Sequence, residues 1–158
     1  MENKAGIYFV NNKGEILMGH PYGHKESFWS IPKGKMEKGE THWQTAMRET
    51  QEESNIDLKG VELNKIYELP KVKYTSGKKT IHTFVVMECN NDLDFSEFDI
   101  KCNAIIPDDA KWNAGKPEFE KFQWASFDVA EELLHSSQQG SIKLIREIYK
   151  DCNESRED

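Results

Sequence analysis

Residues 34–56, GKMEKGETHWQTAMRETQEESNI, decide the fold of this chain and hold its densest set of chemical groups. They predict a glycine-rich loop and then a helix that carries Glu49, Glu52 and Glu53 in its last two turns. Residues at i, i+3 and i+4 lie on one helix face, so these carboxylates repel one another. A hard divalent cation such as Mg2+, which prefers oxygen ligands, would relieve the repulsion. We therefore predict a metal site, the alternative being an ordinary solvated acidic face.

The neighbouring residues favour a helix over about 41–54. Thr41 and Gln44 match a capping box at its start. The acids lie at the C-terminal end, where the helix dipole disfavours negative charge, so helix stability does not explain them. The helix is expected to bury a stripe of residues with helical spacing, namely Trp43, Ala46, Met47 and Thr50. The glutamates then point away from this stripe, over the neighbouring loop.

The spacing of Gly34, Glu40 and the segment 48–56, RETQEESNI, resembles the Nudix box of the Nudix hydrolases. That box is a glycine, a glutamate and the pattern REUXEEXGU, in which U is aliphatic, and every charged position is present here. Thr50 replaces an aliphatic residue at a site expected to be buried. Asn55 replaces a glycine, and Asn is the next best residue for a left-handed backbone after a helix. We expect a small stability cost and no loss of chemistry.

The resemblance implies hydrolysis of a nucleoside diphosphate linked to another group, with Mg2+ or Mn2+ as cofactor. Glu49 and Glu53 would bind the central metal, and the carbonyl oxygen of Gly34 would be a further ligand. Glu52 would share a second metal or accept the proton of the attacking water. The choice of general base stays open, because neighbouring carboxylates titrate as a coupled set.

Further site residues follow from the same resemblance. Glu40 and Arg48 are expected to pair and to hold the loop against the helix, unless they form only a surface salt bridge. A carboxylate a few residues before Trp124 is expected to complete the metal site. Glu118 and Glu120 are the candidates, with Glu118 preferred for its spacing, and the alternative is that both are surface acids.

The substrate is indicated by segment 29–35, WSIPKGK, which has lysine where many Nudix proteins have a second glycine. This form resembles the diadenosine tetraphosphate and diphosphoinositol polyphosphate hydrolases, whose substrates carry many phosphates. The loop 70–79 adds more lysines, although it also reads as a solvated hairpin tip, and its tyrosine could stack on a base. The predicted substrate-binding residues are Lys33, Lys35, Lys71, Lys73, Tyr74 and Lys79.

The favoured function is therefore a Mg2+-dependent pyrophosphohydrolase that cleaves a dinucleoside tetraphosphate to NTP and NMP. The alternatives are hydrolysis of nucleoside triphosphates, capped RNA or inositol pyrophosphates, and a non-catalytic module that senses nucleotides. Segment 112–117, WNAGKP, is similar to a bacterial subgroup of predicted Nudix pyrophosphohydrolases but does not decide the substrate. Trp112 and Phe98 are expected to anchor the irregular stretch 90–118 to the core. His20 and His24 show no metal-ligand spacing.

The whole chain fits one domain over 1–150 with a frayed tail over 151–158, since 158 residues can form a proper core. A net charge of -7 argues against nonspecific binding to long nucleic acids or an anionic membrane. The small-molecule polyphosphate is thus the expected partner. The odd cysteine count predicts reduced thiols at Cys89, Cys102 and Cys152, and the start of the chain has no apolar signal segment. We expect a cytoplasmic protein, and the sequence does not indicate an oligomeric state.

Hydrophobic patterning predicts the remaining elements and, by itself, an α/β or α+β class. The resemblance narrows this class to the Nudix fold, an α/β/α sandwich with a mixed β-sheet. Gly140 is expected to separate two C-terminal helices, the first capped by Ser126 or Asp128. The predicted strands are 6–10, 15–19, 61–69, 80–88 and 119–124, and the predicted C-terminal helices begin near 127 and span 141–150.

Overall fold

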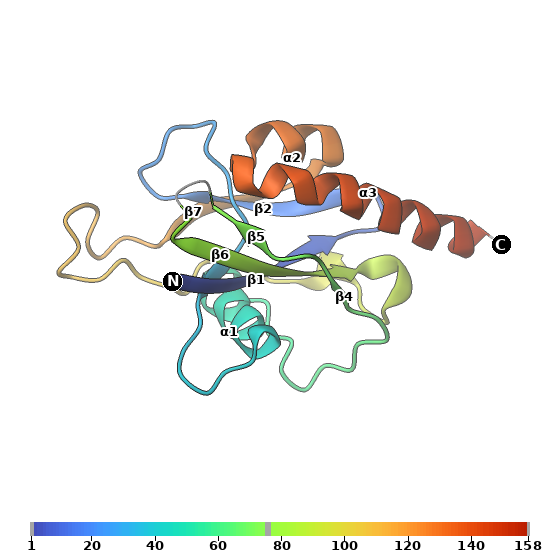
Figure 1. Ribbon diagram of the computed structural model, residues 1–158, viewed down its shortest axis with the longest axis horizontal. Helices are drawn as coiled ribbons and strands as arrows, with labels where there is room; N and C mark the ends of the chain where they lie inside the picture. Colours follow the sequence, from blue (N-terminus) through green and yellow to red (C-terminus); the bar gives the residue numbers. More distant parts are fainter. Residues whose placement is uncertain (1, 75–76, 158) are drawn as a thin grey trace.

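A computed structural model describes residues 2–74 and 77–157, which form a mixed sheet with helices on both faces (Figure 1). The sheet order is β4-β6-β1-β2-β7, with β3 paired to β1 and β5 paired to β6. The strands are β1 (Glu2–Val10), β2 (Glu15–Pro21), β3 (Lys33–Lys35), β4 (Tyr67–Glu68), β5 (Val72–Lys73), β6 (Lys79–Met87) and β7 (Phe119–Ser126). The helices are α1 (His42–Ser54), α2 (Phe127–Leu133) and α3 (Ser136–Glu157), with short 3-10 turns η1 (Glu88–Asn90) and η2 (Phe95–Glu97).

Strands β1 and β6 form the parallel centre of the sheet, in register from Glu2 opposite Lys79 to Val10 opposite Met87. The other strand pairs are antiparallel. A turn links β1 to β2, but β2 stays paired to β1 only near Val10, and β3 pairs with the first half of β1 instead. This arrangement places the loop that contains Gly34 directly beside the centre of the sheet.

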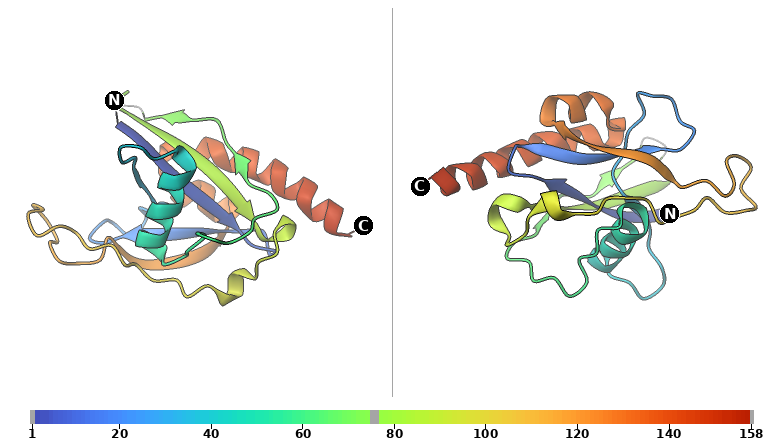
Figure 2. Two further views of the ribbon diagram at one scale, coloured as in Figure 1. Left: turned by 90° about the horizontal axis from the view of Figure 1, so that it is seen from below. Right: turned by 180° about the vertical axis from the view of Figure 1, so that it is seen from behind.

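Alternating side chains of the strands form two cores, one on each face of the sheet. Ile7 and Phe9 point toward α1, whereas Tyr8 and Val10 point toward α2 and α3. Figure 2 shows α1 alone on one face and the two C-terminal helices together on the other. These three layers are the α/β/α sandwich that the sequence predicts.

Helix α1 begins and ends as predicted. Thr41 Oγ1 accepts from the Gln44 amide at 3.1 Å, and Gln44 Oε1 accepts from the Thr41 amide at 2.9 Å, which completes the capping box. Asn55 ends the helix in the left-handed conformation with φ of 67°. Its Nδ2 donates to the Asp99 carbonyl at 2.9 Å, and its Oδ1 accepts from Asn103 at 2.8 Å. Asn55 therefore also fastens the segment 99–103 to the helix end, which glycine could not do.

The predicted strand over 61–69 is wrong for most of its length. Only Tyr67 and Glu68 pair with β6, at the outer edge of the sheet. Before them, the side chain of Asn91 bonds to both the amide and the carbonyl of Lys65, each at 3.0 Å, so a side chain replaces the neighbouring strand there. The short strands β3 and β5 have no hydrophobic pattern and were not predicted. Residues 75 and 76 of the predicted basic loop lie outside the described residues.

The C-terminal region differs from the prediction at both ends. Residues 134–135 separate α2 from α3. Gly140 lies inside α3 rather than between the helices. Ser126 is the cap of α2 and accepts from the Val129 amide. Helix α3 continues to Glu157, so residues expected to fray are helical. Not one helix of the described ranges is long and apolar enough to cross a membrane.

The expected set of three reduced thiols is wrong, because Cys89 and Cys152 form a disulfide. Cys89 lies in η1, directly after β6, and Cys152 is buried near the end of α3. Their Cα atoms lie 6.2 Å apart although 63 residues separate them in sequence, which is why spacing could not reveal the pair. Cys102 remains a free thiol.

The stretch 90–118 contains one correct and one wrong prediction. Phe98 packs on Phe9 and Phe95, with ring centroids 5.8 and 4.9 Å apart, and so anchors the stretch to the core. Trp112 does not anchor it, because the side chain is 72% exposed. It lies in a projecting arm, residues 104–117, that is closed by the bridge between Ile105 and Pro117 (Figure 1). The arm returns to the body at Glu118.

Candidate active site

A pocket of about 490 Å3 opens where β1, β3, the end of α1 and the start of β7 meet. Its lining contains three acids, Glu49, Glu53 and Glu118, together with lysines. Helix α1 supplies the first two carboxylates, and Glu118, directly before β7, supplies the third. Its full lining is Lys4, Pro21, Tyr22, His24, Phe28, Ser30, Lys33, Gly34, Lys35, Glu49, Glu53, Ile106, Glu118 and Phe119.

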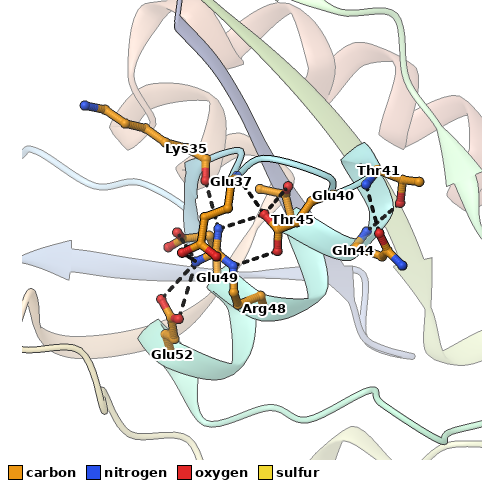
Figure 3. A network of polar contacts seen from close by, with 9 residues as sticks. All are labelled: Lys35, Glu37, Glu40, Thr41, Gln44, Thr45, Arg48, Glu49 and Glu52. Carbon is orange, nitrogen blue, oxygen red and sulfur yellow. Dashed lines mark hydrogen bonds and ion pairs between the residues drawn. The ribbon is translucent and has the colours of Figure 1, made fainter.

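Arg48 is the cation at the centre of the glutamate-rich loop and helix (Figure 3). Its Nε and Nη2 donate to the two oxygens of Glu40 at 2.8 and 3.1 Å, the bidentate geometry that guanidinium groups prefer. Nη2 also donates to the Lys35 carbonyl at 2.9 Å, and Nη1 donates to Glu49 at 2.8 Å and to Glu52 at 3.3 Å. The pair expected between Glu40 and Arg48 is therefore present, and it holds the loop against α1.

Glu40 also orders the turn that leads into the helix. Its Oε1 accepts from the Glu37 amide at 2.8 Å and from the Thr45 hydroxyl at 2.9 Å. These bonds and, most strongly, the bond from Arg48 lower the pKa of Glu40 to about 2, against the opposing effect of burial. Glu40 therefore stays charged and serves the site by positioning Arg48 and the loop.

Glu53 is the most buried acid of the helix, with 6% of the residue exposed. Its Oε1 accepts from the Lys33 amide at 2.8 Å, and its carboxyl group shares a hydrogen bond with Glu118. Burial raises the pKa of Glu53 well above 4.5, and the neighbouring Glu118 and Glu49 raise it further. Burial also raises the pKa of Glu49, although Arg48 opposes the change.

These features fit a divalent cation. Three acids face one pocket, the pKa values of Glu49 and Glu53 are raised, and Arg48 contacts one of the three, Glu49. In the described part of the chain, no three acidic, histidine or cysteine side chains are arranged to hold an ion as they stand. Glu49 contacts Arg48 at 2.8 Å, and Glu53 shares a hydrogen bond with Glu118. Carboxylate oxygens and a nearby loop carbonyl are the donors that Mg2+ prefers.

Gly34 lies directly against the carboxylate of Glu49. A Cβ atom at position 34 would overlap the carboxyl group of Glu49. The loop therefore needs a residue without a side chain here, and this contact brings the backbone of β3 against Glu49.

The two candidate acids before Trp124, Glu118 and Glu120, take different positions in the structure. Glu118 lies at the pocket with Glu53 and Glu49, whereas Glu120 binds Nδ1 of the buried His20 at 2.6 Å. Regular strand alternation would point the side chains of Glu118 and Glu120 to the same face of the sheet. The register between β2 and β7, however, shifts at His20 and Pro21. That bulge explains why the two acids take different positions.

The predicted lysines divide into two groups. Lys33 and Lys35 line the pocket, and Nζ of the half-buried Lys33 donates to Ser30 at 2.8 Å. Burial lowers the pKa of Lys33 to about 8, with Lys4 and Lys79 acting in the same direction. The other predicted residues, Lys71, Lys73, Tyr74 and Lys79, are not among those that line the pocket.

Tyr74 does not offer a free ring for stacking, since it packs on His135 with ring centroids 5.6 Å apart. The sequence-based prediction did not include Lys4, which lines the pocket. Lys4, Gly6 and Tyr8 alternate along β1 and so share one face of the strand, which is the signal that could have indicated it. The prediction also missed Phe28, which stacks on His24 at 4.7 Å beside the pocket. An isolated loop aromatic carries no such signal.

The NUDIX domain family matches residues 2–148 of the chain. An RNA pyrophosphohydrolase of Pelagibacter ubique (strain HTCC1062) is 26% identical over 168 residues, covering 98% of this chain and 90% of that protein. A C. elegans Ap4A hydrolase structure aligns with a TM-score of 0.68 and 18% identity, covering 94% and 98% of the two chains. A NUDIX hydrolase structure from Listeria monocytogenes aligns with a TM-score of 0.66 and 16% identity, covering 95% of each chain. At these identities the structural matches show the fold alone.

The chain belongs to the NUDIX domain family, whose match covers more than nine-tenths of its length. The family match and the RNA pyrophosphohydrolase relatives indicate a hydrolase that acts on pyrophosphate bonds.

Proposed function

We propose that this protein is a Mg2+-dependent pyrophosphohydrolase that cleaves a phosphoanhydride bond of a nucleotide polyphosphate. The observation that carries the proposal is one pocket that is lined both by Glu49, Glu53 and Glu118 and by Lys4, Lys33 and Lys35. Such a pocket can hold both a cation, through the carboxylates, and phosphate oxygens, through the lysines. Without a cation, three carboxylates would repel the anionic substrate.

Each side chain has a defined task in this proposal. Glu49, Glu53 and Glu118, with the carbonyl oxygen of Gly34, would hold Mg2+ or Mn2+. When bound, the metal would neutralise phosphate charge and favour attack by water. Glu52 is the most accessible acid of the helix, with 43% of its side chain exposed, and would accept the proton of the attacking water. Arg48 and Glu40 would position the loop and helix.

The first candidate substrate is a dinucleoside tetraphosphate, cleaved to NTP and NMP. Its support is the Pro-Lys-Gly form of the loop, with Lys33 and Lys35 both at the pocket. The chain also shares its fold with a protein described as an Ap4A hydrolase.

The second candidate is the 5′-polyphosphate end of RNA. Its support is that curated relatives of similar length carry the name RNA pyrophosphohydrolase, at 26% to 28% identity. The acidic chain disfavours contact with a long RNA strand, so recognition would be restricted to the polyphosphate end.

A substrate panel with Mg2+ and chromatographic analysis of products tests the proposal. The panel contains diadenosine tetraphosphate, 5′-triphosphorylated RNA, capped RNA, nucleoside triphosphates and an inositol pyrophosphate. ATP plus AMP from diadenosine tetraphosphate at the highest kcat/KM is the expected result. Preferential release of pyrophosphate or phosphate from RNA would replace the first candidate by the second. Tight binding of a nucleotide with no product from any substrate would make the protein a sensor and refute the proposal.

A further inference from the structure

Three lysines on adjacent strands surround the carboxylate of Glu2. Glu2 is not one of the acids that line the pocket. Glu2 Oε2 lies 3.3 Å from Lys35 Nζ, and Oε1 lies 3.6 Å from Lys4 Nζ and 3.9 Å from Lys79 Nζ. We call Lys4, Lys35 and Lys79 the lysine triad. Figure 3 shows the side chain of Lys35 extending away from the Arg48 network, although its carbonyl belongs to that network.

Strand register explains why the four residues share one face. Lys4 is directly opposite Lys35 in the β1–β3 pair, and Glu2 is directly opposite Lys79 in the β1–β6 pair. Glu2 and Lys4 are two residues apart on one strand, so they point to the same side. The triad therefore lies on paired strands, at the end of the sheet where β1 and β6 begin.

The carboxylate of Glu2 does not fully satisfy the triad. All three N–O distances exceed the usual range of a strong charge-assisted hydrogen bond, about 2.7–2.9 Å. Oε1 is buried and makes no hydrogen bond. One negative charge also faces three positive charges. A phosphate group is wider, carries more acceptor oxygens and has a charge of about -1.5 to -2.

We propose that the lysine triad is a phosphate-binding site that Glu2 occupies as a competing internal anion in the free protein. Lys4 and Lys35 line the same pocket as Glu49, Glu53 and Glu118, whereas Lys79 is not among its lining residues and reaches the group through its contact with Glu2. A polyphosphate that binds near the proposed metal ligands Glu49, Glu53 and Glu118 would therefore also reach the triad and displace Glu2. The ligand class rests on the proposed function, but the competition between Glu2 and phosphate does not depend on turnover.

Binding of inorganic tripolyphosphate, measured by calorimetry in EDTA at low ionic strength, tests this inference. Glu2→Gln is expected to tighten binding about threefold or more, because it removes the competing charge and keeps the side-chain size. Lys79→Gln is expected to weaken binding by a similar factor. The matched control is Glu62→Gln, an exposed acid outside the pocket, which should leave affinity unchanged.

Equal affinity of Glu2→Gln and the wild type, or weaker binding by the variant, would overturn the inference and leave Glu2 as a structural ion pair. Thermal unfolding of each variant confirms that folded protein is titrated. The two proposals can fail separately. Tighter binding by Glu2→Gln without hydrolysis of any nucleotide would refute only the proposed function, and hydrolysis with no Glu2 effect would refute only the triad.

Discussion

The backbone amide of Lys33 donates a 2.8 Å hydrogen bond to the carboxylate of Glu53 and so joins β3 to the last turn of α1. A bond from the loop fixes a glutamate that the helix alone would leave free to rotate. The side chain of the same residue donates to Ser30, which also lines the pocket. Lys33 therefore links the helix that carries Glu53 to the segment that carries Ser30.

Glu53→Gln is expected to be more stable than the wild type at pH 7 without metal, by about 1 kcal/mol. The pKa of Glu53 is raised, so its ionised form destabilises the folded state, and a neutral amide removes that cost. Glutamine can still accept from Lys33 and donate to Glu118. Urea unfolding in EDTA measures the change. A loss of stability would show that the buried charge is favourable and that the local electrostatics are misassigned.

Gly34→Ala is expected to fold but to lose most activity, by about tenfold or more. The new methyl group would overlap the carboxyl group of Glu49, and a flexible side chain can move away at little cost in stability. The displaced carboxylate would then no longer face the pocket.

Gly140→Ala is the matched control for that variant. Gly140 lies inside α3 with no atom near its added Cβ, so alanine should stabilise the helix by roughly 0.5–1 kcal/mol without affecting activity. Steady-state kinetics and thermal unfolding of both variants provide the comparison. Full activity of Gly34→Ala would contradict the close approach of β3 to Glu49.

Glu40→Gln is expected to reduce stability at pH 7 by about 1–3 kcal/mol, since it weakens the bidentate bond to Arg48. The pKa of Glu40 is lowered from 4.5 to about 2 in the folded state, so its contribution is complete above 4.5 and disappears as pH falls toward 2. The difference between wild type and variant in urea unfolding should therefore shrink between pH 5 and pH 2. A difference that stays constant with pH would exclude this ion pair as its source.

Removal of the disulfide by Cys152→Ser is expected to reduce stability by roughly 2–4 kcal/mol without a change in kcat, because the bond joins η1 to the end of α3 and not to the pocket. Thiol titration of the denatured wild type should find one free thiol, that of Cys102, before reduction and three after it. Three free thiols in the unreduced protein would contradict the bond.

Local signals in the sequence predicted α1 and its surroundings correctly. The capping box of Thr41 and Gln44 and the left-handed end at Asn55 depend on residues close together in the chain, so pattern reading could find them. The parallel pairing of β1 with β6 could not be read from local pattern, because it joins segments more than 70 residues apart.

The candidate site was predictable where one helix carries it, as with Glu49 and Glu53. Lys4, the Cys89–Cys152 bond and the different positions of Glu118 and Glu120 depend on strand register or long-range packing. The role assigned to Glu52 and the metal ligands themselves remain predictions.

Hydrolysis of the best substrate of the panel by wild type and Glu53→Gln, each with Mg2+ and with EDTA, tests the central claim most directly. The account predicts turnover by the wild type with Mg2+, none with EDTA, and a loss of about 100-fold or more in kcat for the folded variant. Equal turnover by the two proteins, or turnover by the wild type in EDTA, would contradict the claim that these carboxylates act through a bound cation.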